Sequence, residues 1–137
     1  VNIVLSAKAR DMAQAGLIAD ISVSLPENLP IADPDLCALF GNAVDNAIEA
    51  AKDAADKRIT IRARADKGLL MLRVTNAYAG RREEKADGLF ATTKADRRAH
   101  GFGLRGMREI AARNGGTLET TAKDGVFELV ACLPLNK

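Results

Sequence analysis

The segment from residue 33 to about residue 55 has one apolar side, and this feature most restricts the folds open to the chain. Asp33 is a good N-cap residue, and Pro34 suits the first helical position, where its missing N–H costs nothing. The pattern therefore predicts a long amphipathic helix that ends near Ala55. Its apolar residues recur at helical spacing, three or four positions apart: Leu36, Leu39, Phe40, Ala43, Val44, Ala47 and Ala51.

Another side of this predicted helix carries a stripe of amides and carboxylates: Asn42, Asn46, Glu49 and Asp53. The stripe holds no Lys or Arg, and Asn is about 0.7 kcal/mol worse than Ala inside a helix. Carboxamide and carboxylate oxygens suit a hard cation such as Mg²⁺, which usually comes with a phosphate. We therefore predict that Asn42 and Asn46 are metal ligands, whereas simple solvation of the surface is the preferred interpretation for Glu49 and Asp53.

The rest of the chain predicts an α+β fold. We expect a helix over 2–16, a strand over 18–25, a hairpin over 57–65 and 69–76, a helix over 104–113, and a hairpin over 117–122 and 126–133. Strands grouped in hairpins predict a two-layer α/β sandwich. Its sheet would be mixed and mostly antiparallel, with about five strands and helices on one face.

Bulk properties set limits on the class of protein. The chain has 137 residues, which suits a single domain over 1–137, and its net charge of +2 does not support binding to nucleic acid. No apolar run approaches the roughly 20 residues of a membrane span. The only histidine is His100, so a pair of catalytic histidines is excluded within this chain. Because the sequence begins with Val1 rather than Met, we expect a fragment of a longer protein.

A glycine-rich turn leads into the predicted helix over 104–113. In His100-Gly101-Phe102-Gly103-Leu104, the two glycines let backbone N–H groups approach an anion, and the helix N-terminus adds about half a positive charge. A structural turn is the commoner explanation for such a motif when it stands alone. The sequence has neither the full Rossmann fingerprint nor a Gly-Lys-Ser/Thr P-loop.

The segment over 77–100 is polar and charge-rich, and a loop of this length is unusual in a compact domain unless it is functional. We interpret it as an active-site lid. Thr93 and Lys94 could approach a phosphate, while a solvated surface remains the preferred interpretation for Arg97 and Arg98.

Together these motifs resemble the GHKL superfamily of ATPases and kinases over about residues 33–134. Asn42-x-x-x-Asn46-Ala47 resembles its N box, Phe90 to Lys94 its lid segment, and Gly101-x-Gly103-Leu104 its second glycine box. The C-terminal part of the family's domain is similar to Gly115-Gly116-Thr117-Leu118 and the final hairpin. Within the superfamily the chain looks most like the catalytic domain of a sensor histidine kinase, in the branch related to peptide-pheromone quorum sensors.

This resemblance implies a Bergerat-type fold that binds ATP and Mg²⁺ and transfers the γ-phosphoryl group to a histidine on a separate segment. The implied catalytic residues are Asn42, Asn46 and Lys94. The implied nucleotide-binding residues also include Asn76, Thr93, Gly101, Gly103 and Leu104.

Asn76 marks a departure from the family pattern. The resemblance places it where most members carry an Asp that accepts a hydrogen bond from the adenine amino group. An Asn can still accept that bond, although a neutral acceptor is weaker than a charged one. The peptide-pheromone branch resembles this chain in having Asn there, so we interpret the site as a variant one, and a site that has lost nucleotide binding remains an alternative.

The resemblance also implies partners and a location. Residues 1–16 would be the junction to upstream dimerisation helices that carry the acceptor histidine. The resemblance also implies that a response regulator is a partner and that the parent protein is a homodimer. It implies no nucleic-acid partner. The chain would be a cytoplasmic domain of a membrane-anchored parent.

Other functions remain open. Hydrolysing GHKL ATPases resemble one another in a Glu that activates water where this chain has Asn42, which favours the kinase. A serine kinase that inhibits a sigma factor and a non-catalytic interaction module are further alternatives.

Overall fold

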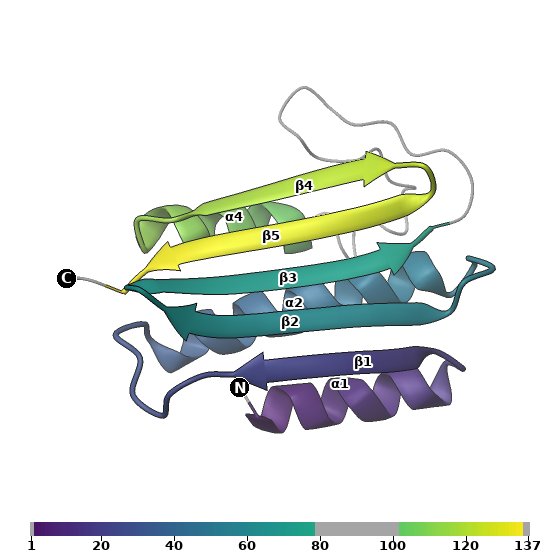
Figure 1. Ribbon diagram of the computed structural model, residues 1–137, viewed down its shortest axis with the longest axis horizontal. Coiled ribbons are helices and arrows are strands. Elements are labelled where there is room, and N and C mark those ends of the chain that lie inside the picture. Colours follow the sequence, from purple (N-terminus) through teal and green to yellow (C-terminus); the bar gives the residue numbers. More distant parts are fainter. Residues whose placement is uncertain (1, 79–101, 136–137) are drawn as a thin grey trace.

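The computed structural model describes residues 2–78 and 102–135, which form two layers (Figure 1). One layer is a five-stranded sheet with the strand order β1-β2-β3-β5-β4. Only β1 and β2 pair in parallel, and the other neighbours are antiparallel. The predicted α+β sandwich is therefore confirmed. The elements are α1 (Asn2–Gln14), β1 (Ile18–Ser24), α2 (Asp33–Ala51), β2 (Arg58–Asp66), β3 (Leu69–Ala77), α4 (Phe102–Arg113), β4 (Thr117–Lys123) and β5 (Val126–Pro134).

Both hairpins turn through two residues with positive φ. Lys67 and Gly68 have φ values of 53° and 77°, and Asp124 and Gly125 have values of 54° and 79°. Two consecutive left-handed residues are typical of the tight turn whose twist matches that of the flanking strands. The predicted hairpins are confirmed, with strand ends that shift by about one residue.

Glycines with positive φ follow the ends of α1 and α4, and α1 ends at Gln14, two residues before the predicted end. Gly16 and Gly115 have φ values of 76° and 77°, which an L side chain adopts only with strain. In α4, the N–H of Gly116 donates to the carbonyl of Ala111 (2.7 Å), which satisfies a carbonyl that the helix itself leaves unpaired.

The bounds of α2 differ from the prediction at both ends. Its N-cap is Ala32, so Asp33 is the first helical residue and makes no capping hydrogen bond. The helix ends at Ala51 rather than near Ala55, and Asp53 lies in the turn beyond it. Lys52 still has helical φ and ψ, and its N–H donates to the carbonyl of Ile48, so the helix ends without a left-handed cap residue.

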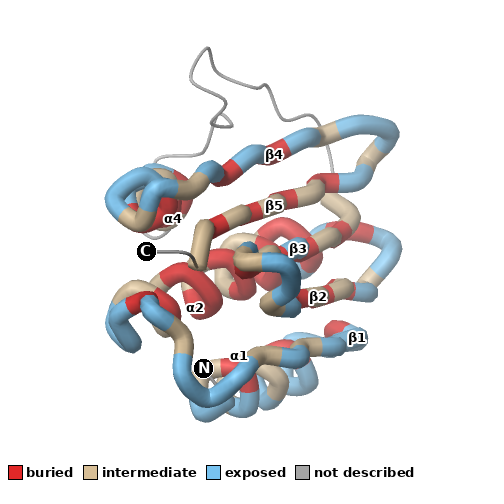
Figure 2. Tube along the Cα trace, turned by 60° about the vertical axis from the view of Figure 1, so that its left-hand side comes forward, coloured by how far each residue is buried: buried red, intermediate tan, exposed pale blue. Residues whose placement is uncertain are grey.

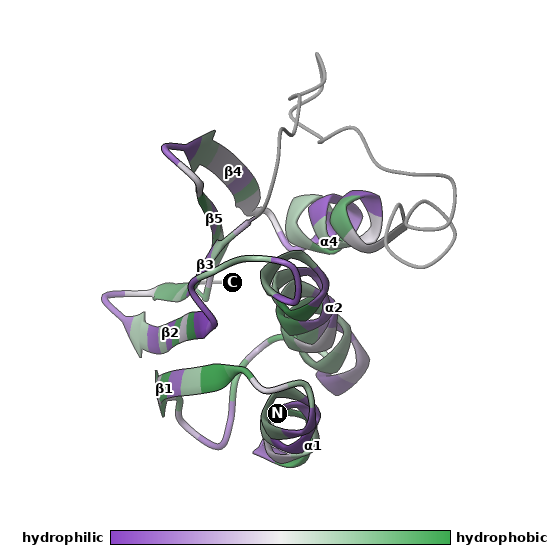
Figure 3. Ribbon diagram, turned by 90° about the vertical axis from the view of Figure 1, so that its right-hand side faces the viewer, coloured by the Kyte–Doolittle hydropathy of each residue, from purple (hydrophilic) through white to green (hydrophobic). Residues whose placement is uncertain are grey.

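The core lies between the sheet and α2, and Figures 2 and 3 show the helices on one face of the sheet. Within α2, Leu39, Phe40 and Val44 are completely buried. The inner sheet residues are those at alternate positions, such as Ile59 and Ile61 on β2, and these are also completely buried. α2 packs on β2 and β3, α1 lies beside β1, and α4 packs on β4 and β5. Within 2–78 and 102–135, no helix combines the length and apolarity needed to cross a membrane.

Candidate nucleotide site

Asn42 and Asn46 are half-buried on the side of α2 that turns away from α1. The α1 side of the helix is set by Gly41, where an added Cβ would lie 3.6 Å from Val4 Cγ1 and 3.8 Å from Lys8 Cε. Each next residue is turned by about 100°, so Asn42 does not point at α1.

The opposite flank of α2 faces α4. Asp35 lies seven residues before Asn42, on the same side of the helix after two turns. Its Oδ1 accepts a hydrogen bond from Arg113 Nη2 (2.5 Å), and its Oδ2 accepts one from Asn114 Nδ2 (3.1 Å). The asparagine pair therefore lies on the flank of α2 that is turned toward α4.

Asn76 lies near the end of β3, on the face that the helices cover. Only 2% of its surface is exposed, and it pairs with Ile59 of β2 and Phe127 of β5. Its Nδ2 donates to the carbonyl of Ala77 (2.8 Å), which fixes which side of the amide is the nitrogen. Its Oδ1 is buried and has no hydrogen-bond partner among the described residues.

Gly103 lies in the first turn of α4. A Cβ added there would meet no described atom within 4 Å, so the packing of the domain does not require glycine. Leu104 beside it is buried, with 6% of its surface exposed. Among the described residues, the start of α4 thus combines an anchored apolar residue with space next to the backbone.

The topology brings these pieces to one end of the molecule. The contact of Asp35 with Arg113 joins the start of α2 to the end of α4, so the two helices run in opposite directions and α4 begins toward the C-terminal half of α2 (Figure 1). A short connection joins α2 to β2, whose residue Ile59 pairs with Asn76. The end of β3, the C-terminal half of α2 and the start of α4 therefore share one end of the two-layer structure.

The carboxylates of the predicted stripe have other roles or positions. Glu49 forms an ion pair with Lys52 (3.5 Å), the C-cap residue of α2, and Asp53 is exposed beyond the helix. In the described part of the chain, no group of three or more His, Cys, Asp or Glu could hold a metal. A divalent ion at this site would have to rely on the carboxamide oxygens of Asn42 and Asn46 and on the phosphates of its ligand.

Part of the predicted site lies in the segment before α4. Thr93, Lys94 and Gly101 lie outside the described residues, as does nearly all of the predicted lid. The start of that lid needs a correction, because Ala77 is the last residue of β3 and the N–H of Tyr78 donates to the carbonyl of Gly125 (3.0 Å).

Two contacts that α2 makes with the other helices were not predicted. Asp35 meets Arg113 across 78 positions of sequence, and Lys8 of α1 forms an ion pair with Asp45 of α2 (2.7 Å). A charged residue on a helix gives no local signal of a distant partner.

The family model described as GHKL domain matches residues 32–134. The solved catalytic domain of histidine kinase ThkA is similar in structure, with a TM-score of 0.75 and 20% sequence identity over 99% of this chain and 92% of that chain. A second form of the same domain gives a TM-score of 0.71, with 20% identity over 98% of this chain and 90% of that one.

The histidine kinase AdeS of Acinetobacter baumannii is also similar, with a TM-score of 0.67 and 17% identity over 99% of this chain. This chain spans 63% of that structure. No curated protein sequence matches. The family match covers the elements that carry Asn42, Asn46, Asn76 and Gly103, and the chain therefore belongs to the GHKL family, with the fold of histidine kinase catalytic domains.

Proposed function

We propose that this domain binds Mg-ATP and transfers the γ-phosphoryl group to a histidine on a separate segment of its parent protein. The observation that carries the proposal is the buried, unpaired Oδ1 of Asn76. Leaving such an acceptor without a partner costs about 1–3 kcal/mol, so a ligand that donates a hydrogen bond there recovers that cost.

The exocyclic amino group of adenine is a donor of this kind. The Nδ2 of Asn76 is already hydrogen-bonded to the carbonyl of Ala77, which leaves the oxygen as the group available for the ligand. Leu104, which is buried at the start of α4, suits the flat surface of a base, whereas Ile48 lines a groove beside α1. The chemistry of this end of the molecule therefore fits a purine with an amino group.

The phosphates would lie toward α2 and the start of α4. Asn42 and Asn46 supply neutral oxygen ligands for Mg²⁺, and the open backbone at Gly103 leaves room for an oxyanion. Mg²⁺ would offset the charge of the phosphates during transfer. We also expect the phosphates to be approached by Thr93, Lys94 and Gly101.

The side chains favour transfer to an imidazole over hydrolysis. Asn42 is an amide and cannot take a proton from water at neutral pH, and Glu49 of the same stripe is paired with Lys52. A histidine acceptor needs no such base, because the neutral imidazole is itself the nucleophile.

The family also supports a setting for this reaction. Upstream dimerisation helices of the same parent would carry the acceptor histidine, with α1 as their junction to this domain. A response regulator would then receive the phosphoryl group. The same proposal makes the parent a homodimer that is anchored in the membrane, with this domain in the cytoplasm. It also assigns the chain to the peptide-pheromone branch.

The melting temperature of the domain in the presence of Mg-ATP tests the binding step. A ligand selective for the folded state stabilises it by about 2.7 kcal/mol at a hundred times its Kd, so the melting temperature should rise. Asn46→Ala should reduce that rise strongly. Asn28→Ala, which removes an exposed loop asparagine, should leave it unchanged.

The transfer step is tested with γ-labelled ATP and the parent's histidine-bearing segment supplied as a separate chain. Label should appear on that segment and should be lost in Asn46→Ala. A melting temperature that does not respond to any nucleotide would instead favour the interaction module, and rapid release of free phosphate without labelling would favour an ATPase.

A further inference from the structure

The face of the sheet opposite the helices carries a group of arginines on β2 and β3. Inward residues alternate with outward ones along each strand, so Arg58, Arg62 and Arg64 of β2 share the open face with Arg73 of β3. The same face of β1 to β3 holds the carboxylates of Asp20 and Asp66. This part of the molecule is therefore more basic than the chain as a whole.

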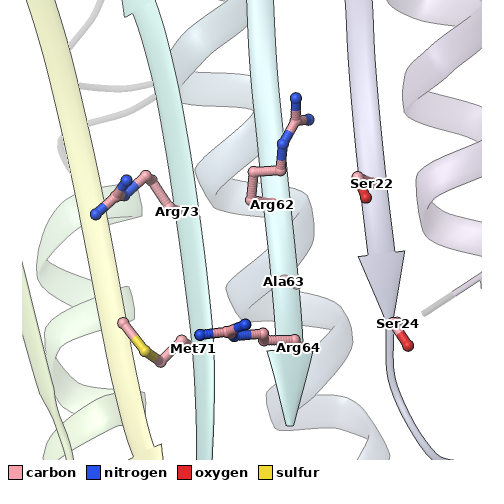
Figure 4. A pocket seen from close by; sticks show the side chains of 7 residues that line it. All are labelled: Ser22, Ser24, Arg62, Ala63, Arg64, Met71 and Arg73. Atoms are coloured by element: carbon pink, nitrogen blue, oxygen red, sulfur yellow. The ribbon is translucent and has the colours of Figure 1, made fainter. Parts of the chain in front are cut away.

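A groove of about 410 Å³ lies among these side chains (Figure 4). It crosses three strands, with serine hydroxyls on the β1 side and Met71 on the β3 side. Its lining residues are Ser22, Ser24, Arg62, Ala63, Arg64, Met71 and Arg73.

The arginines of the groove differ in how far they are neutralised. Arg62 donates to Asp20 Oδ2 (3.0 Å) and to the carbonyl of Asp20 (3.0 Å). The hydrogen bond to the side chain lowers the pKa of the Asp20 carboxyl below its ordinary value. Arg73 lies 3.6 Å from Glu128, a loose ion pair. Arg64 makes no hydrogen bond or ion pair with any residue in 2–78 or 102–135.

The register adds an unfavourable charge arrangement. Arg62 and Arg73 are direct cross-strand partners, and like charges in such positions destabilise a sheet. Arg64 follows two residues after Arg62 on the same face and pairs in register with Met71. A ligand with negative charge would relieve this repulsion and supply the partner that Arg64 lacks.

We propose that this groove docks an acidic, extended segment of a partner protein through the carboxylates of its Asp or Glu side chains. In Figure 4 the side chains of Arg64 and Arg73 point to the same side and that of Arg62 points away from them, so the three guanidinium groups do not converge on one point. That arrangement suits several carboxylates spread along a chain better than a single phosphate. Arginine binds a carboxylate through two parallel hydrogen bonds, and the hydroxyls of Ser22 and Ser24 can donate to others.

Fluorescence anisotropy with a labelled oligoglutamate peptide tests this docking surface. The wild-type domain should bind the peptide, and added salt should weaken binding because the contacts are exposed charges. Arg64→Gln should weaken binding about tenfold, the loss of one charge-assisted hydrogen bond, and Arg64→Gln with Arg73→Gln should weaken it further. Saturating Mg-ATP should not displace the peptide, because the groove lies on the face of the sheet away from the helices.

Arg10→Gln is the matched control, since it removes the same charge from an exposed position on α1, in the other layer. It should leave the affinity for the peptide unchanged, and the melting temperatures of all variants should match that of the wild type. Equal affinity of the wild type and the double variant would overturn the proposal. So would binding of an oligonucleotide or of inorganic phosphate in the groove when oligoglutamate does not bind.

Discussion

At the scale of single residues, Asn76 is the exception in an apolar layer. It is one of two buried polar residues in the described part of the chain, and its neighbours along the inward face of β3 are Leu70, Leu72 and Val74. A polar atom without a partner in such a layer is retained only where something other than stability requires it. This makes Asn76 the residue at which stability and binding can be separated most cleanly.

Asn76→Leu should separate the two properties. The variant loses the bond from Nδ2 to the carbonyl of Ala77 but also removes the unpaired Oδ1, so the free energy of unfolding of the free domain should change by less than about 1 kcal/mol. Its affinity for ATP should fall more than about tenfold, because the purine loses its acceptor. Urea denaturation and isothermal titration calorimetry measure the two quantities. Thr75→Val, on the open face of the same strand, should change neither much, and an unchanged affinity in Asn76→Leu would remove Asn76 from the site.

At the scale of elements, the start of α4 tests whether its glycine serves the fold or the ligand. Gly103→Ala should keep or slightly raise the stability, by up to about 1 kcal/mol, because Ala is the better helix former and its Cβ meets no described atom within 4 Å. Nucleotide affinity should nevertheless fall, since the methyl group occupies the space beside the backbone. Gly106→Ala, one turn later in α4 and equally free of contacts, is the matched control and should retain full affinity. If both variants bind ATP alike, the start of α4 does not approach the phosphates.

The other end of α4 obeys a different constraint. An added Cβ at Gly116 would lie 2.1 Å from the carbonyl oxygen of Cys132 and 2.9 Å from Leu133 Cα, and neither backbone atom can move freely inside the sheet. Gly116→Ala should therefore lower the free energy of unfolding by about 3 kcal/mol. Gly125→Ala should lower it by only about 1 kcal/mol, because that site has a positive φ but open space. Urea denaturation compares the two variants, and equal losses would contradict the collision.

At the scale of the whole molecule, Asp35 connects the two helices that flank the proposed nucleotide site. It accepts from Arg113 Nη2 and Nε and from Asn114 Nδ2, and the hydrogen bond with Asp35 raises the pKa of Arg113 above its ordinary value. Only 17% of the Asp35 side chain is exposed, whereas Arg113 is 58% exposed. The contact therefore orients α4 on α2 more than it stabilises the fold.

Asp35→Ala should lower the melting temperature modestly and weaken nucleotide binding, because the start of α4 loses its fixed position beside α2. The double variant Asp35→Ala with Arg113→Ala should lower the melting temperature by less than the sum of the two single variants, since each removes the same contact. Arg105→Ala, an exposed arginine of α4 that no described contact holds, is a control for stability alone. Fully additive effects would show that the two side chains act independently.

Local patterns were enough to predict the elements. The two hairpins depend on the short-range backbone preferences of Lys67-Gly68 and Asp124-Gly125, and the structure confirms both hairpins. The ends of α2 were predicted less well. Ala32 rather than Asp33 is the N-cap, and the helix ends at Ala51 rather than near Ala55.

The sequence by itself determined which elements form, which of their faces are apolar, and that Asn42 and Asn46 share one side of a helix, because periodicity and turn chemistry act over a few residues. Only the tertiary structure decided that the Oδ1 of Asn76 is buried without a partner, that Asp35 meets Arg113, and that Arg62 faces Arg73 across two strands. These facts depend on strand register and on the packing of one layer against the other, which bring together residues far apart in the chain and leave no trace in local spacing.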